Sequence, residues 1–280
     1  MKIIDFHTHI FPPGIKKDRD TYVKRDALFA ELYSNPKAGI LTAEELIEAM
    51  DSAGVSRAVA LNINWLTMDL CRETNDYIMD AIARYPTRLT GFGAVTLSPG
   101  EAALKEIERC VKGGIRGLGE LRPTWKMLKN ENLKLLDDMS HLVAGHNLTI
   151  LFHASEPVGH LYPGKGNATP GLLYPVISRY PGITFVCAHW GGGLPFYELM
   201  PEVSTALKNT FFDTAATRFL YKKEIFQHVA ALLGEGKILF GTDYPVISFE
   251  KLISEIKGLN LPPPAMESIF HGNAEKLLGI

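Results

Sequence analysis

Six side chains of the kinds that bind metal ions are spread along the sequence. They are four histidines, a glutamate and an aspartate: His7, His9, Glu120, His153, His189 and Asp243. Each lies at or just past the end of an apolar run that predicts a β-strand. Imidazole and carboxylate groups together can fix a divalent ion and leave one position for water. The ion would lower the pKa of that water toward about 7, so that hydroxide exists at neutral pH.

Each of these residues alone has a simpler interpretation. A His-x-His pair arises by chance in many sequences, and a histidine at a strand end is more often a hydrogen-bonded buried group than a ligand. Glu120 alone would pair with Arg116 or Arg122. Asp243 alone could form the turn before Pro245. The coincidence of the whole set at strand ends favours a metal site.

The spacing of the first two histidines also fits one ion. Side chains alternate faces along a strand, so His7 and His9 share a face. Asp5 lies two residues earlier and is the candidate hydrogen-bond partner of these rings. Asp243 could bind the ion, take the proton of the bound water and later hand it to a leaving group.

The elements that must position these residues alternate from end to end. Strands are predicted at 2–7, 55–61, 89–95, 114–120, 148–153, 182–188, 210–214 and 237–241. Helices are predicted at 42–53, 69–84, 100–112, 131–145, 170–180, 195–208, 222–233 and 249–257, with a last helix over 264–278. Thr42 and Glu45 form the capping-box pattern that begins the first helix.

Eight strand-then-helix units predict a single α/β domain over residues 1–280, a (β/α)8 TIM barrel with an extra C-terminal helix. Active sites of such barrels form at the carboxyl ends of the strands, where the six residues fall. An open doubly wound sheet is the alternative, although no G-x-G-x-x-G follows the first strand. The segment up to Gly39 and residues 154–169 are expected to be long loops at the rim.

Composition excludes several classes of function. Lys and Arg total 29 and Asp and Glu total 31, so a net charge of −2 offers no basic field for nucleic acid or an anionic membrane. No apolar run reaches the roughly 18–20 residues of a membrane span. The three cysteines are too scattered for a disulfide framework, and the first residues have no secretory pattern. We therefore expect a cytoplasmic protein whose partner is a small-molecule substrate.

Several stretches resemble the amidohydrolase superfamily of metal-dependent barrel enzymes: IDFHTHIFP, GIRGLGELRP, LFHASE, FVCAHWGGG and LFGTDYP. The closing HGNAEKLLG also resembles the branch that includes aminocarboxymuconate-semialdehyde decarboxylase. The resemblance implies that His7, His9, His153 and Asp243 bind the metal. It implies that His189 either binds a second ion or acts as an acid–base group, and it suggests a homodimer.

Glu120 leaves the number of ions open. Many members of the superfamily use a carboxylated lysine at the end of a middle strand to bridge two metals, and this sequence has Glu120 there. The glutamate either bridges two ions or lies beside one. Zinc is the first candidate for the metal, and manganese, iron and nickel suit the same ligands.

Two activities fit this set. In a hydrolase, metal-bound hydroxide would attack an amide, lactone or ester-like carbon, with Asp243 as general base and acid. In a non-oxidative decarboxylase of a small unsaturated or aromatic acid, His189 would move a proton. We expect the hydrolase, because Glu120 adds a further ligand, and keep the decarboxylase as the alternative. A non-catalytic binding barrel and a TatD-like nuclease are disfavoured by the intact ligand set and the lack of a basic stripe.

Four further residues are candidates for substrate binding. Arg122 should face the same side as the glutamate two residues before it and could hold a substrate carboxylate, or pair with a neighbouring acid. Trp190 and Tyr244 could form aromatic walls, and core packing explains them equally well. His160 lies in a Gly-rich loop that could reach substrate. Residues 191–193, all glycine, would let the backbone turn sharply or pass close to the site.

Overall fold

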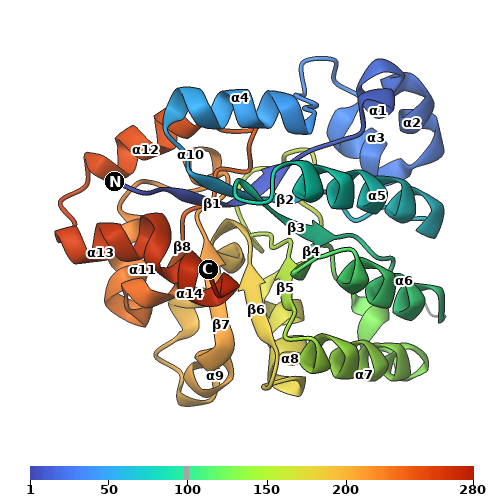
Figure 1. Ribbon diagram of the computed structural model, residues 1–280. Coiled ribbons are helices and arrows are strands. Elements are labelled where there is room, and N and C mark those ends of the chain that lie inside the picture. Colours follow the sequence, from blue (N-terminus) through green and yellow to red (C-terminus); the bar gives the residue numbers. More distant parts are fainter. Residues whose placement is uncertain (98–100) are drawn as a thin grey trace.

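Eight parallel strands form one sheet in sequential order (Figure 1). The computed structural model describes residues 1–97 and 101–280. The strands are β1 (Ile4–His9), β2 (Arg57–Leu61), β3 (Leu89–Gly93), β4 (Gly117–Leu121), β5 (Thr149–Phe152), β6 (Thr184–Cys187), β7 (Thr210–Asp213) and β8 (Ile238–Leu239). Phe6 N donates to Phe240 O at 2.7 Å, which joins the last strand to the first. The predicted TIM barrel is confirmed.

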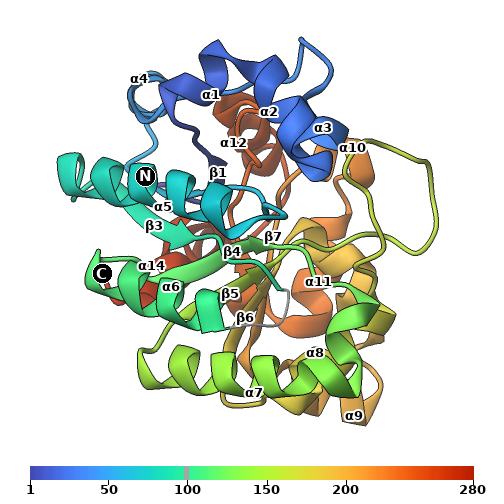
Figure 2. The same ribbon diagram turned by 90° about the vertical axis from the view of Figure 1, so that its right-hand side faces the viewer.

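Helices surround this barrel on the outside (Figures 1 and 2). They are α4 (Ala43–Ala53), α5 (Met68–Arg84), α6 (Glu101–Lys112), α7 (Asn130–Gly145), α8 (Pro170–Arg179), α9 (Pro201–Ala206), α10 (Thr217–Leu220), α11 (Ile225–Leu233) and α12 (Phe249–Lys257). The C-terminal helix comprises α13 (Pro263–Glu267), a π-turn (Ser268–Gly272) and α14 (Asn273–Leu278). Short 3-10 segments occupy Trp125–Leu128, Leu207–Asn209 and Glu235–Lys237.

The helix boundaries follow the predictions closely along most of the chain. The capping box is present: Glu45 N donates to Thr42 Oγ1 and Thr42 N donates to Glu45 Oε2 at 2.9 Å. Gly100, the predicted start of one helix, lies outside the described residues. Across the described ranges, no helix combines the length and the apolar character that a bilayer crossing requires.

The segment before Gly39 corrects the prediction of a long loop. It contains α1 (Pro13–Lys17), α2 (Arg19–Arg25) and α3 (Ala27–Tyr33), which we call the N-terminal insertion. Asp26 caps α3 by accepting hydrogen bonds from Leu28 N and Phe29 N, both at 2.9 Å. Helices of five to seven residues are too short to show a clear apolar period, so tertiary packing decides them.

The predicted helices 195–208 and 222–233 are also corrected. The first is replaced by a turn segment, His189–Tyr197, and the short α9; its first five residues have φ between 55° and 93°, a left-handed conformation. Pro195 and Pro201 interrupt a regular helix there. The second begins later, at Ile225, and α10 precedes it.

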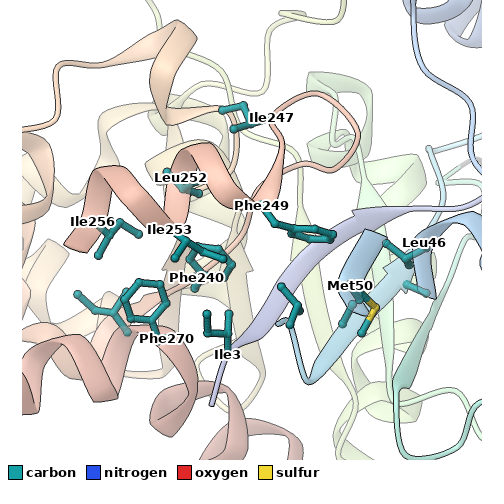
Figure 3. Close-up of a cluster of buried hydrophobic side chains, with 14 of the residues drawn as sticks. Ile3, Leu46, Met50, Phe240, Ile247, Phe249, Leu252, Ile253, Ile256 and Phe270 are labelled. Atoms are coloured by element: carbon teal, nitrogen blue, oxygen red, sulfur yellow. The ribbon is translucent and has the colours of Figure 1, made fainter. Parts of the chain in front are cut away.

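Apolar side chains fill the barrel and the layer between strands and helices. Inside, Phe6, Phe92 and Leu151 are fully buried. Outside, Phe240, the residue after β8, packs in a cluster with Phe249 of α12, as Figure 3 shows. This two-layer packing makes the strands a rigid frame for the residues at their ends.

Extra residues bend two strands where candidate ligands lie. In β1 the pairing with β2 shifts between Asp5 and Thr8, and in β4 the pairing with β5 shifts between Leu118 and Leu121. Such bulges re-aim the side chains that they contain. The shifted segments include His7 and Glu120, so both residues depart from simple alternation.

Candidate metal centre

The six predicted ligands meet at the carboxyl ends of the strands. They form two groups, and within each group one ligand atom per residue lies within 4.8 Å of the others. The first group is His7, His9 and Asp243; the second group is Glu120, His153 and His189. In the first group His9 Nε2 lies 3.0 Å from Asp243 Oδ1 and 3.1 Å from His7 Nε2.

Glu120 lies between the two groups. Its Oε1 is 2.9 Å from His153 Nδ1 and 3.3 Å from His189 Nε2. Its Oε2 is 3.8 Å from both His7 Nε2 and His9 Nε2. The carboxylate therefore has one oxygen directed toward each group, an arrangement that suits either a bridge between two ions or a contact beside one.

Hydrogen bonds determine which ring nitrogen of two histidines faces the site. His7 Nδ1 lies 2.8 Å from Asp213 Oδ2, and His189 Nδ1 lies 3.2 Å from the carbonyl oxygen of Ala215. A carbonyl only accepts, and an ionised carboxylate only accepts, so the network assigns the hydrogen to Nδ1 in both rings. Their Nε2 atoms then face the cluster, where each can bind a metal ion or carry a proton.

Asp213, at the end of β7, is the residue that sequence reasoning missed. Its Oδ2 orients the ring of His7, and its Oδ1 accepts from His189 N at 2.9 Å and from Ala215 N at 3.1 Å. One buried carboxylate therefore positions residues of both groups. The signal was available: TFFD is an apolar run that ends in an acid, as the other ligand-bearing runs end in ligands.

Asp5 does not have the role that we predicted. Its carboxylate accepts from the backbone of His7 at 2.8 Å and from Thr242 Oγ1 at 2.7 Å, and no ring nitrogen of the described histidines contacts it. Burial raises the pKa of Asp5 to about 7, although these hydrogen bonds oppose the rise. Asp5 joins β1 to the turn after β8, because Thr242 donates to its carboxylate from both its backbone and its hydroxyl.

The site electrostatically favours added positive charge. Burial by itself lowers the pKa of His7, but Asp213 and the other nearby carboxylates raise it to about 10. Burial opposes the charge of His189 as well, and Glu120 and Asp243 raise its pKa to about 9. The histidines in turn hold the pKa of Glu120 and Asp243 below the usual range despite burial. The same surplus of carboxylate charge would attract a divalent cation.

A cavity of about 460 Å³ opens onto the cluster. Five of the six predicted ligands line it, and His7 lies behind them. Other walls come from the N-terminal insertion, the segments after β2, β4 and β8, and residues 37–39, 160–164 and 216–220. The volume is that of a small-molecule site.

Two of the four predicted substrate-binding residues line this cavity. Arg122 and His160 do so. Trp190 is fully buried and packs in the outer core, and the ring of Tyr244 stacks on Phe249 at 4.3 Å. The structure therefore does not bring Trp190 or Tyr244 to the cavity, and core packing accounts for both.

Arg122 joins three segments at the cavity rim. Its Nη1 and Nη2 lie 3.2 and 3.3 Å from the two carboxylate oxygens of Glu31, and Nη2 donates to the carbonyl of Gly164 at 3.0 Å. Gly164 N donates to Glu31 Oε1 at 3.0 Å. We call Glu31, Arg122 and Gly164 the rim tie. The ion pair with a neighbouring acid, one of the two predicted roles of Arg122, is present.

The glycines after His189 turn the chain sharply, as expected. A Cβ on Gly192 would lie 2.2 Å from the carbonyl oxygen of Ser155, and one on Gly191 would lie 2.7 Å from the ring of Phe212. Both glycines also have positive φ. Side chains do not fit there. The glycines let the chain after His189 pass close to Ser155, which keeps His189 beside the end of β5, where His153 lies.

Together these features define a (β/α)8 barrel with a cluster of candidate metal ligands at the carboxyl ends of its strands. The sequence matches the model of the amidohydrolase family over residues 4–280. The chain belongs to the amidohydrolase family, and the resemblance drawn from its motifs is confirmed.

Two relatives and one solved structure are similar over most of the chain. The 2-amino-3-carboxymuconate-6-semialdehyde decarboxylase of Dictyostelium discoideum is 24% identical in an alignment 345 positions long, which covers 99% of this chain and 91% of the relative. The gamma-resorcylate decarboxylase of a Polaromonas species is 22% identical over 250 residues, 75% of this chain and 76% of the relative. The 5-carboxyvanillate decarboxylase of Novosphingobium aromaticivorans, complexed with manganese and 4-hydroxy-3-methoxy-5-nitrobenzoic acid, superposes with a TM-score of 0.81 at 16% identity, covering 99% of this chain and 96% of that chain.

Proposed function

We propose that the protein is a divalent-metal-dependent, non-oxidative decarboxylase of a small aromatic or unsaturated acid. The feature of this chain that carries the proposal is the cavity, in which apolar side chains such as Leu28, Ile63 and Phe219 share the walls with the ligand cluster. Apolar walls suit a flat ring, and the cluster suits its carboxylate. The names of the two relatives support decarboxylation over the hydrolysis that we expected first.

The donor set fits a divalent ion. We infer that His7, His9 and Asp243, together with the neighbouring Glu120, would hold it. Manganese is the first metal to test, ahead of zinc, because the similar decarboxylase structure contains manganese. When bound, the ion would hold oxygen atoms of the substrate and draw electron density from the acid.

The reaction also needs a proton donor. As the bond to the carboxylate breaks, carbon dioxide leaves and the electron pair remains on the ring or alkene carbon, which then takes a proton. We assign that proton to His189, which lines the cavity and whose ring is fixed by the Ala215 carbonyl. The neighbouring carboxylates of Glu120 and Asp243 raise the pKa of this ring, which favours a proton on it. Asp243 is the second acid–base group that borders the cavity.

The test measures the two chemistries side by side. Protein stripped with a chelator is reloaded with Mn²⁺ or Zn²⁺ and incubated with hydroxybenzoates and unsaturated dicarboxylic acids. We expect release of carbon dioxide and, in D₂O, deuterium at the vacated carbon. His189→Asn should abolish both, whereas His146→Asn, at an exposed position of another element, should not. Hydrolysis of lactones or amides with no carbon dioxide from any acid would contradict the proposal.

A further inference from the structure

We propose that Tyr33 orients the substrate by donating a hydrogen bond from its phenol to an oxygen that the substrate keeps after carbon dioxide has left. This inference rests on the proposed function and deepens it, because it makes the substrate a hydroxy- or oxo-substituted acid. Tyr33 belongs to α3 of the N-terminal insertion and not to a strand end, so it was not among the predicted site residues.

The position of Tyr33 places its side chain in the same cavity as the ligand cluster. Tyr33 lines that cavity together with Glu120 and Asp243 and is only 8% exposed. Within residues 1–97 and 101–280, no group forms a hydrogen bond with its hydroxyl. A cavity-lining hydroxyl that no protein group engages is free to donate a hydrogen bond to a ligand oxygen.

The surroundings of Tyr33 keep its phenol neutral. Burial raises the pKa of the hydroxyl, and the negative charges of Asp243 and Glu120 raise it further. A neutral phenol retains its hydrogen at every physiological pH and acts as a donor. It therefore complements an acceptor such as a phenolate, an enolate or a carbonyl oxygen.

Packing holds the ring of Tyr33 in place before any ligand binds. It stacks on Phe29 with centroids 4.7 Å apart and meets the edge of Phe11 at 5.2 Å. The Asp26 cap also accepts from Leu66 N at 2.8 Å, which fastens the beginning of α3 to the loop after β2. A donor that is already oriented loses little entropy on binding, which favours specific recognition.

The test compares ligands that differ by one hydroxyl. Manganese-loaded wild type and Tyr33→Phe are titrated calorimetrically with benzoate and with the tightest-binding of 2-, 3- and 4-hydroxybenzoate. We expect Tyr33→Phe to weaken the hydroxybenzoate about tenfold and to leave benzoate unchanged, because phenylalanine preserves the packing. Tyr22→Phe is the matched control: Tyr22 contacts the same aromatic cluster, but its hydroxyl bonds to Glu73.

Three results would overturn the assignment. If Tyr33→Phe weakens both ligands equally, or if the wild type does not distinguish them, Tyr33 has only a structural role and the decarboxylase proposal stands. If the wild type binds none of these acids, the proposed substrate class fails together with the assignment. Decarboxylation of a hydroxybenzoate, if found, adds a second readout. The kcat/KM of Tyr33→Phe, divided by that of Tyr22→Phe, should fall by about the same factor as the affinity of Tyr33→Phe for the hydroxybenzoate.

Discussion

At the scale of single residues, one carboxylate positions much of the candidate metal centre. Asp213 fixes the tautomer of His7 and holds the backbone of His189. An amide in its place accepts a weaker hydrogen bond from the His7 ring, and its NH₂ group can face the ring as a donor instead. Partners of this kind are worth about 10–100-fold in metal affinity.

We therefore expect Asp213→Asn to weaken manganese binding by about 10–100-fold, measured by competition with a chromophoric chelator. Asp137→Asn, which alters an acid on α7, serves as the control and should leave the affinity unchanged. An unchanged affinity in Asp213→Asn would show that the hydrogen bond to His7 contributes nothing to the metal site.

A second prediction at this scale concerns Asp243. Its oxygen lies 3.0 Å from His9 Nε2 and it lines the cavity, so it can serve both as ligand and as acid–base group. Asp243→Asn should lower kcat by at least about 10²–10⁴-fold while circular dichroism stays unchanged. Near-normal turnover with the best acid of the panel would exclude both roles.

At the scale of elements, the left-handed turn after β6 tolerates little change. A Cβ at Gly192 meets backbone 2.2 Å away at φ +60°. Gly192→Ala should lower the free energy of unfolding by about 2–5 kcal/mol, from backbone strain and overpacking. Gly236→Ala, where nothing lies within 4 Å, should change it by less than about 0.5 kcal/mol. Urea unfolding of the two variants measures the difference, and equal midpoints would contradict the close contact.

The rim tie connects the N-terminal insertion to residues 160–164, and it is exposed enough to contribute little to global stability. Glu31→Gln should lower the unfolding free energy by less than about 1 kcal/mol. It should nevertheless speed amide hydrogen exchange in the loop around Gly164, because that amide loses its carboxylate acceptor. Exchange of the barrel strands provides the internal control. Unaltered exchange in the loop would mean that other contacts hold it.

Elements also show how far sequence reasoning reached. Strand–helix alternation located all eight strands, and the positions of His153 and Asp243 at strand ends predicted that the candidate ligands would lie together, as they do. The insertion helices, the bulge beside His7 and the part played by Asp213 were not foreseen. Each depends on contacts between segments distant in sequence, which leave no local periodicity. For the same reason Trp190 looked like a cavity wall although it lies in the core.

At the scale of the whole molecule, an ion that binds only the folded barrel must stabilise it. At a free metal concentration one hundred times the dissociation constant, the free energy of unfolding rises by about 2.7 kcal/mol. For a domain of this size that corresponds to about 5–10 °C in Tm. We expect calorimetry to show a rise in Tm of this size when Mn²⁺ is restored to chelator-treated protein. The same protein in metal-free buffer is the blank. No shift with either Mn²⁺ or Zn²⁺ would count against the centre.

The meeting of β1 and β8 has a consequence for how the protein is made. His7 and His9 come from the first strand and Asp243 from the turn after the last, so the first ligand group exists only once the two ends of the barrel have met. A chain still on the ribosome, synthesised as far as α11, carries every other donor and lacks the completed site. A metal ion held by this group would therefore be bound only after translation of residue 243, and its binding would report that the ring of strands has closed.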